Sequence, residues 1–492
     1  MNANPTKLSR RAVLAGAPML LAAKTRRPNF LFLLADDHAA THRPRTPHLD
    51  RLAREGTRFA QHFCNSPVCT PSRQSFFTGL LPHATGVTRL PTPLSEDRAT
   101  LAQRFRNAGY ATAVFGKMHF NRPGRAGLHG FDIACTEDVL AKNWEAVMKP
   151  GPLPAGVATK PPWRPFRDPA RIWLNADMLP FPRHDAQMKS CYLVSEAERF
   201  LEEHRDRPFA LWASFSEPHS PYDFPLEFSQ RYSPRQFTPY RVGPEDAAQI
   251  PKIFRDLSAA DKSGIMASYY TSVEFLDRNV GRVLEKLRAL NLDRDTLVVY
   301  MADHGYCLGQ HGRFEKHCGY DSALLVPLLM RWPGRIRRGV VRELTEHVDV
   351  PATITDLIGI EPPEGRHGRS LRPYLEGRAT APRDHVFSEY LENEEAYIRT
   401  RQWKFIYCSG RRARGDGYIT DDPTPGRYVR LFDLKNDPGE FSNVAPANGE
   451  VVARMQTLLL DRFRSTHPEA AVEPRGLSAE ESLDWYLRPR DA

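Results

Sequence analysis

Short apolar runs that end in charged or imidazole side chains recur along the chain. The run Phe30–Ala35 is followed by two aspartates, and the run Ala111–Phe115 leads to a lysine and a histidine. Two further runs, one beginning at Phe209 and one at Thr296–Met301, end in the same way. Continuous apolar runs of about four to eight residues are typical of strands that are buried on both faces of a parallel sheet. We therefore predict a buried strand at each of the four runs.

Segments with helical periodicity separate these runs. Leu49 and Leu52 stand at helical spacing before Gly56, a second helical segment stops at Gly109, and a long amphipathic segment precedes Thr296. Strands that alternate with helices predict an α/β fold with a large, mostly parallel sheet flanked by helices. Ligands of such sheets bind beyond the carboxyl ends of the strands. The polar residues that end the apolar runs stand at those ends.

Two stretches depart from this alternation. Residues 135–190 are rich in proline and tryptophan, and we predict an irregular insertion that covers the site; its tryptophans include Trp144, Trp163 and Trp173. Residues 381–492 contain short aromatic and β-branched runs separated by turns, followed by a helical pattern at 450–466. This pattern predicts a small antiparallel sheet. We therefore expect a main α/β domain at 25–380 and a C-terminal subdomain at 381–492.

The first 24 residues form a separate unit. Arg10 and Arg11 precede a modest apolar run from Ala12 to Ala23, which is shorter than the roughly 20 residues that a membrane-spanning helix needs. A basic start, an arginine pair and a short apolar run are typical of a twin-arginine export signal. The signal predicts a periplasmic or secreted protein. No other segment has the sequence of a stable membrane anchor.

Composition narrows the class of protein. The 492 residues are 41% hydrophobic and 26% charged, which is typical of a soluble globular enzyme. The formal net charge of +9 suits an anionic substrate. The basic residues are scattered and no dense basic run with interleaved aromatics occurs, so we do not expect nucleic-acid binding. Composition leaves the oligomeric state open.

The seven cysteines are too few for a fold built on disulfides, and no Cys-x-x-Cys pair predicts a zinc ribbon or a thioredoxin-like site. Cys307 and Cys318 are candidates for a bridge in an oxidising compartment. Folding in the reducing cytoplasm before export argues against that bridge.

Oxygen-rich groups stand at two of the strand ends. Asp36 and Asp37 follow the first predicted strand, and Asp303 and His304 follow the last one. Hard divalent cations prefer such ligands, and Ca²⁺ takes about six to eight of them. Zinc sites usually show more histidine or cysteine at close spacing. The pattern predicts a site for a hard divalent cation.

Cationic side chains cluster near the same strand ends. Collected around a metal ion, they would form a socket for a tetrahedral oxyanion, because fixed positive charge stabilises developing negative charge. Arginine suits the bidentate geometry of an oxyanion. These residues are Arg73, Lys117, His119, His219 and Lys316.

Cys69 stands in the stretch "NSPVCTPSRQSFFTG", where Thr70 is a candidate N-cap and Pro71 suits the first turn of a helix. The helix would direct its N-terminal dipole at Cys69 and at any bound anion. Cys69 could be a buried small hydrophobe, half of a disulfide, a thiolate nucleophile or the precursor of another group. A soft thiolate is a poor match for a hard cation such as Ca²⁺. An oxygen nucleophile at this position would remove the mismatch.

The motifs around these residues resemble those of the sulfatase family. "CTPSR" followed by "QSFFTGLLPHATGV" is similar to the family signature, and five further motifs follow the family order between about residues 28 and 446. They are "LLADD", "GKMH", "EPHSPY", "ADHGYCLGQHGRFEK" and "LFDLKNDPGEFSNVA". The resemblance implies an alkaline phosphatase-like fold. It also implies that a formylglycine-generating enzyme oxidises Cys69 to Cα-formylglycine, whose hydrate supplies the oxygen nucleophile.

The resemblance also implies the residue roles. Modified Cys69 and four side chains would bind one Ca²⁺, with Mg²⁺ or Mn²⁺ as alternatives; the four are Asp36, Asp37, Asp303 and His304. Arg73 and Lys117 would hold the hydrate and the sulfate oxygens, and His119 would deprotonate the remaining hydroxyl to expel sulfate. His219 and Lys316 would hold sulfate and assist departure of the alcohol. Some family members carry asparagine at the position of His304.

These motifs predict an enzyme that hydrolyses a carbohydrate or aryl sulfate ester. A phosphonate or phosphate ester hydrolase of the same superfamily is an alternative, because phosphoryl and sulfuryl groups are both tetrahedral. A non-catalytic protein that binds sulfated glycans is a second alternative. It would lack a ligand or nucleophile position, and none is missing from this sequence.

Overall fold

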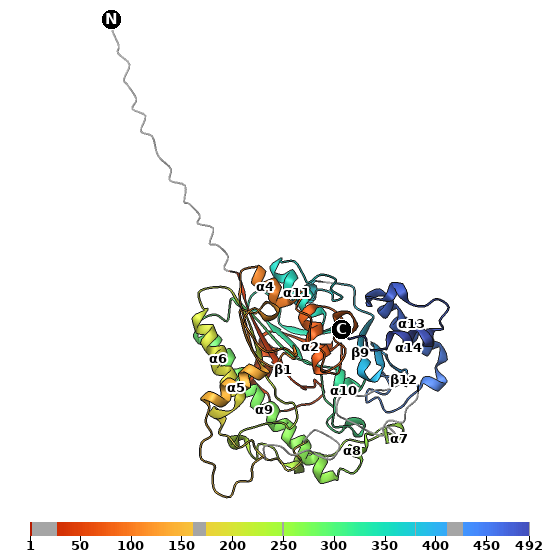
Figure 1. Cartoon of the computed structure of the whole chain (residues 1–492), viewed down its shortest axis with the longest axis horizontal. Helices are drawn as coiled ribbons and strands as arrows, with labels where there is room; N and C mark the ends of the chain where they lie inside the picture. Colours follow the sequence, from red (N-terminus) through yellow and green to blue (C-terminus); the bar gives the residue numbers. More distant parts are fainter. Residues whose placement is uncertain (2–26, 161–173, 248–249, 379, 411–426, 492) are drawn as a thin grey trace.

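The computed structural model describes residues 1, 27–160, 174–247, 250–378, 380–410 and 427–491 (Figure 1). Apart from Met1, the predicted signal segment 1–24 lies outside the described residues, as do Trp163 and Trp173. Among the helices in the described ranges, none combines the length and the apolar character needed to cross a bilayer.

The main part of the molecule is built on an eight-stranded sheet with the strand order β4-β3-β5-β1-β6-β7-β2-β8. Its strands are β1 (Asn29–Ala35), β2 (Thr57–Phe63), β3 (Ala111–Gly116), β4 (Ile133–Thr136), β5 (Phe209–Ser214), β6 (Thr296–Ala302), β7 (Leu328–Arg331) and β8 (Gly339–Glu346). All neighbours pair in parallel except β7, which runs antiparallel to β6 and β2. The predicted mostly parallel sheet is confirmed.

Helices cover both faces of this sheet (Figure 1). The longer ones are α1 (Pro47–Glu55), α2 (Cys69–Thr78), α4 (Leu101–Asn107), α5 (Glu137–Val147), α6 (Lys189–Glu203), α9 (Ala259–Ala289) and α11 (Asp349–Ile358). Single-turn helices are α3 (Pro82–Thr85), α7 (Pro244–Ala247), α8 (Lys252–Arg255), α10 (Asp321–Leu324) and α12 (Arg372–Leu375).

Strand β1 lies in the middle of the sheet because its side chains are apolar on both faces. Leu31 and Leu33 belong to a buried cluster with residues of α6 and α9. Phe32 faces the opposite way, into a cluster with residues of α2, α4 and α11, and its ring stacks on Trp212 with the centroids 4.4 Å apart. Burial of each such large side chain stabilises the fold by about 1.5–3 kcal/mol. This double burial holds the carboxyl end of β1 in place.

A second, antiparallel sheet has the strand order β12-β11-β10-β9, as predicted for the C-terminal part. Its strands are β9 (His385–Tyr390), β10 (Glu395–Thr400), β11 (Trp403–Cys408) and β12 (Tyr428–Asp433), and the helices after it are α13 (Gly449–Thr466) and α14 (Ala479–Tyr486). Leu459 and Phe463 of α13 are buried in one cluster with residues of this sheet. The buried Glu346 at the end of β8 joins the two sheets, since it accepts a hydrogen bond from the Phe387 amide at 2.8 Å.

Residues 135–190 are more regular than predicted. They contain the end of β4 and the whole of α5, so the prediction of an irregular insertion is wrong for residues 137–147. The cause is local: Glu137 and Asp138 lie in the first turn of α5, where acidic side chains favour the helix dipole, and Leu140 and Trp144 give the helix a buried face.

Candidate active site

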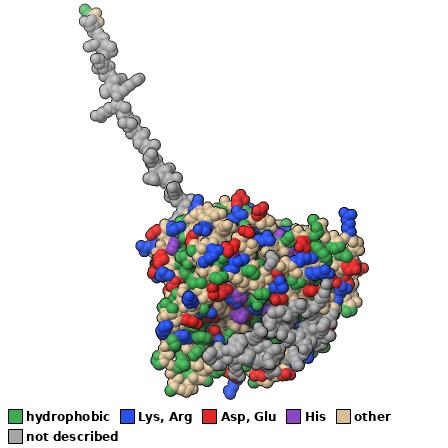
Figure 2. Space-filling model, viewed as in Figure 1, with side chains coloured by type: hydrophobic (Ala, Val, Ile, Leu, Met, Phe, Trp, Pro, Cys, Tyr) green, Lys and Arg blue, Asp and Glu red, His purple; other side chains and the backbone are tan. Residues whose placement is uncertain are grey.

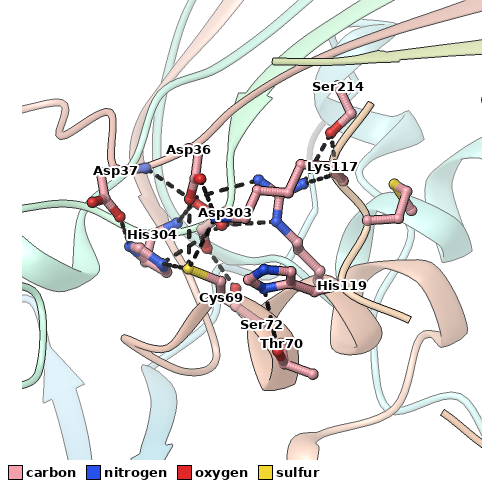
Figure 3. A network of polar contacts seen from close by, with 12 residues as sticks. Asp36, Asp37, Cys69, Thr70, Ser72, Lys117, His119, Ser214, Asp303 and His304 are labelled. Atoms are coloured by element: carbon pink, nitrogen blue, oxygen red, sulfur yellow. Dashed lines mark hydrogen bonds and ion pairs between the residues drawn. The ribbon is translucent and has the colours of Figure 1, made fainter. Parts of the chain in front are cut away.

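The polar residues predicted from the sequence converge at the carboxyl ends of four adjacent strands, β3, β5, β1 and β6. Asp36 and Asp37 follow β1, and Asp303 and His304 follow β6. Lys117 and His119 follow β3, whereas His219 follows β5. Figure 3 shows most of these side chains directed at one point near Cys69. The remaining two predicted residues are Arg73 on α2 and Lys316 in the loop after β6. The structure thus brings all nine predicted side chains together around Cys69.

Cys69 is the first residue of α2 and is 1% exposed. Its sulfur lies 3.0 Å from the Lys316 ammonium, 3.2 Å from His304 Nε2 and 3.5 Å from a carboxylate oxygen of Asp36. Burial raises the pKa of the Cys69 thiol to about 12, and the charge of Asp36 adds to this rise. This shift favours the protonated thiol at neutral pH and argues against a thiolate nucleophile at the unmodified residue.

The helix that carries Cys69 differs in one respect from the prediction. Its N-cap is Val68, and Thr70 lies inside the first turn, so the assignment of Thr70 as the cap is wrong. The Ser72 amide donates to the Val68 carbonyl at 3.0 Å. The Thr70 hydroxyl is directed sideways and donates to the Leu90 carbonyl at 2.8 Å.

The three carboxylates of the site are buried and carry strong local partners. Lys117 pairs with Asp36, and Lys316 lies 2.9 Å from Asp37. Burial alone would raise the pKa of Asp36, but Lys117, His219 and Arg73 lower it well below its usual range. Burial likewise opposes ionisation of Asp37, and Lys316 and His219 lower its pKa. Both carboxylates are therefore ionised.

Asp37 has a left-handed backbone conformation, with φ of 68°. Aspartate tolerates this region better than most residues, but the conformation still needs support from its surroundings. The Asp37 amide donates to Asp303 at 3.2 Å, and the Tyr269 hydroxyl of α9 donates to the Asp37 carbonyl at 2.7 Å. These two contacts hold the Asp37 side chain beside His304, whose Nδ1 lies 3.3 Å away.

Arg73 is fully buried one turn along α2. Its Nε donates to Asp303 at 2.9 Å, and its Nη1 donates to the Ser214 hydroxyl at 2.9 Å and to the Lys117 carbonyl. The guanidinium therefore binds the ends of three strands together. These donors contact protein groups, and the role in holding the hydrate and sulfate stays a prediction.

The two histidines beside the site are both kept neutral. Burial and the charges of Lys117 and Arg73 lower the pKa of His119 well below its ordinary value of 6.5. Burial, Lys117 and Lys316 lower the pKa of His219 to about 4. Neutral imidazoles can accept protons at neutral pH.

A cavity of about 410 Å³ opens beside Asp36, Lys117 and His219. Its other walls come from α5, the segment before α6, the start of α6 and the loop after β5, and they include Trp144, Phe181, Glu217 and Asp223. Figure 2 shows histidine side chains at the centre of one face of the molecule. The cavity has room for the alcohol part of a substrate next to the charged site.

Some site residues carried no recognisable motif. Ser214 ends β5 and accepts from Arg73, and Glu137 of α5 accepts from the backbone amides of Met118 and His119 at 3.0 and 2.9 Å. Only the position of Ser214 at the end of an apolar run could have marked it.

Cys307 and Cys318, the candidates for a bridge, lie close together. Both are free thiols, and their sulfur atoms lie 3.6 Å apart. A bridge between them stays a prediction.

Fold and site together define an alkaline phosphatase-like hydrolase for a tetrahedral oxyanion ester. Residues 28–360 match the family model described as Sulfatase, and residues 309–465 match the model described as N-sulphoglucosamine sulphohydrolase, C-terminal. The chain belongs to the sulfatase family and is a sulfuric ester hydrolase.

Individual relatives agree with this assignment. The chain is 29% identical to a choline-sulfatase of Rhizobium meliloti, over 86% of this chain and 83% of the relative. It is 26% identical to an N-acetylglucosamine-6-O-sulfatase of Bacteroides thetaiotaomicron, again over 86% and 83%. Among solved structures, a phosphonate monoester hydrolase from Silicibacter pomeroyi has a TM-score of 0.74 at 24% identity and covers 91% of this chain and 97% of its own. A 2-O GAG sulfatase has a TM-score of 0.67 at 23% identity, with 93% and 96% covered.

Proposed function

We propose that this enzyme hydrolyses a carbohydrate or aryl sulfate ester. The nucleophile would be the aldehyde hydrate of oxidised Cys69, assisted by one divalent cation, with Ca²⁺ as the preferred ion. The observation that carries the proposal is the enclosure of Cys69: Lys316, His304 and Asp36 lie 3.0, 3.2 and 3.5 Å from its sulfur. Lys117 lies 3.8 Å from the same atom. With a pKa of about 12, the thiol itself has no role as a nucleophile at neutral pH. A two-electron oxidation by a formylglycine-generating enzyme would replace it with an oxygen nucleophile.

The donor set fits a hard divalent cation. One ligand atom from each of Asp36, Cys69, Asp303 and His304 lies within 4.8 Å of the others, and all four residues are buried. Asp37 belongs to an overlapping group with Asp36 and Cys69. Carboxylate oxygens are the preferred ligands of Ca²⁺ and Mg²⁺. When bound, the ion would supply positive charge that polarises the sulfate group and favours an ionised oxygen on residue 69.

The surrounding side chains have separate tasks in this proposal. Lys117 and Lys316 lie within 3.8 and 3.0 Å of the sulfur of Cys69, where their charges would stabilise the oxygens of a bound sulfate. His219 lines the cavity that would hold the alcohol. His119, kept neutral by burial, would accept the proton whose loss accompanies release of sulfate.

Relatives support sulfate as the natural group, since those named above with similar sequences are sulfatases of choline and of an amino sugar. The phosphonate monoester hydrolase shares the fold, so parallel assays are needed. An aryl sulfate and an aryl phosphonate monoester would be compared at equal enzyme concentration. We expect a higher kcat/KM for the sulfate, and a higher value for the phosphonate would overturn the choice.

The nucleophile is tested by mass spectrometry of the peptide that contains residue 69, after expression with a formylglycine-generating enzyme. We expect an aldehyde in active protein, and an intact thiol in active protein would refute the proposal. Cys69→Ala and Asp303→Ala are expected to abolish turnover in folded protein. Wild-type rates in either variant would refute the mechanism.

We also propose export through the twin-arginine pathway to the periplasm or the medium. Support comes from Arg10, Arg11 and the short apolar run that follows them. Fractionation of cells that express wild type or a variant with both arginines replaced by lysine tests this. Unchanged export of the double variant would refute the proposal.

A further inference from the structure

The imidazole of His119 has a hydroxyl partner on one nitrogen. Thr70 Oγ1 lies 3.3 Å from His119 Nδ1, and Figure 3 shows this contact next to Cys69. The backbone of His119 is held separately: its amide donates to Glu137 at 2.9 Å, and its carbonyl accepts from Gln74 at 2.9 Å. The backbone contacts fix the position of the His119 main chain. The Thr70 hydroxyl determines which ring nitrogen carries the proton.

The single hydrogen of the Thr70 hydroxyl has two candidate acceptors. The Leu90 carbonyl lies at 2.8 Å, closer than the ring nitrogen, and a carbonyl can only accept. Thr70 therefore donates to Leu90, and its oxygen accepts the Nδ1–H of His119. A neutral imidazole with its proton on Nδ1 has its lone pair on Nε2. The lone pair that a base for sulfate release needs is thereby on Nε2.

The loop that carries Leu90 is held by a residue from the C-terminal end of the chain. The Asp491 carboxylate accepts from the backbone amides of Thr88 and Arg89 at 3.2 and 3.0 Å and from the hydroxyls of Thr88 and Thr92. It also pairs with Arg89 Nε at 3.2 Å, and its side chain is 1% exposed.

Asp491 lies outside both matched family segments, which end at residues 360 and 465. A buried carboxylate with this many donors is expensive to displace, because each unpaired group would bear its full desolvation penalty. The contact therefore fixes the position of residues 88–92 and, through the Leu90 carbonyl, the direction of the Thr70 hydroxyl.

We propose that Thr70 and Asp491 are positioning residues that hold His119 in the Nδ1–H tautomer, with Nε2 as the base for sulfate release. The proposal rests on the function proposed above. In that step Nε2 takes the proton of the remaining hydroxyl on residue 69, and the C=O bond of the aldehyde re-forms. The electron pair of the broken C–O bond leaves with sulfate, and water then restores the hydrate.

Kinetics with a chromogenic aryl sulfate separate this role from a structural one, because the alcohol leaves before sulfate does. Thr70→Val preserves shape and removes the hydroxyl. We expect kcat to fall about 10- to 100-fold, at or below the lower limit of the roughly 100- to 10,000-fold range for general acid–base catalysis, because the base is misdirected and not removed. KM should fall by the same factor, so that kcat/KM stays within about twofold of wild type. A pre-steady-state burst of one alcohol per aldehyde should appear.

Every rate is divided by the fraction of protein that carries the aldehyde, measured by mass spectrometry, so that the variants are compared at equal amounts of nucleophile. Thr70→Ser keeps the hydroxyl and should restore kcat. Asp491→Ala should give the same pattern with a smaller loss, about 3- to 10-fold, because it acts through loop position. Asp206→Asn, at a side chain that is 91% exposed, is the control for loss of a carboxylate.

The outcomes are distinct. Equal losses of kcat and kcat/KM without a burst, in Thr70→Val or in Asp491→Ala, would overturn the inference and leave the proposed function intact. Equal rates for the valine and serine variants would also overturn it. A wild-type enzyme that is fully converted to the aldehyde and inactive on every sulfate ester tested would refute the proposed function, and with it the role given to His119.

Discussion

Replacement of Arg73 by methionine should destabilise the whole molecule, although the change lies in the active site. The guanidinium is fully buried and donates to Asp303 and Ser214 at 2.9 Å each, as well as to the Lys117 carbonyl. Methionine fills much of the same volume and donates to none of them. Removal of one partner of a buried ion pair costs about 3–5 kcal/mol, because the remaining charge is left uncompensated. We expect a loss of this size in the free energy of unfolding.

Urea unfolding followed by circular dichroism measures this loss, with two comparison variants. Arg73→Lys keeps the charge but not the branched donors, and should lose about 1–3 kcal/mol. Arg106→Met removes an ion pair with Asp132 in which the two side chains are 51% and 42% exposed. Exposed pairs contribute at most about 1 kcal/mol. If Arg73→Met unfolds at the same urea concentration as Arg106→Met, the view that Arg73 binds the strand ends together is wrong.

Three further predictions concern pH and metal. Burial and Lys117 lower the pKa of His119 well below 6.5, so its imidazole stays unprotonated and kcat should stay constant as the pH falls through 6.5. A decrease in kcat on the acid side that begins at or above pH 6.5 would contradict this. Burial alone would raise the pKa of Glu346, but Arg383 and Arg462 lower it from its ordinary value of 4.5 to about 2. The ionised form therefore stabilises the fold fully above pH 4.5, and this contribution decreases as the pH falls from 4.5 and is lost through about pH 2. Glu346→Gln should accordingly lower the thermal midpoint at pH 7 but much less at pH 3, and equal differences at both would contradict the assignment. Chelation should lower both the activity and the thermal midpoint of unfolding, and added Ca²⁺ should restore both. A ligand at 100 times its Kd stabilises the folded protein by about 2.7 kcal/mol. An unchanged midpoint would count against a metal ion in this site.

Much of the sheet was predictable because its strands are buried on both faces. Phe30–Ala35 and Thr296–Met301 differ from β1 and β6 by one residue each. The direction of β7 was not predictable, because a strand of three apolar residues and one arginine carries no signal for a parallel or an antiparallel partner. Helix α5 was missed because proline and tryptophan in the wider segment obscured its amphipathic pattern.

The site was predictable as far as its residues stand at strand ends or in motifs. Asp36 and Asp303 are examples, since parallel strands bring their carboxyl ends to one edge. The residue type and position of Thr70 predict a helix cap, whereas the N-cap position is Val68, whose side chain makes no capping hydrogen bond. The role of Asp491 depends on a contact 402 residues away in the chain, which no local pattern records.

The burial of Cys69 has a consequence for the order of events during synthesis. Its side chain is 1% exposed, and its enclosure includes Lys316, which lies 247 residues further along the chain. At about 5–20 residues per second, a ribosome needs about 12–50 s to add that length. Under the oxidation of Cys69 proposed above, a modifying enzyme would reach the thiol most readily on the nascent chain, before Lys316 is added and the enclosure forms. Slower translation between these two residues would lengthen that period.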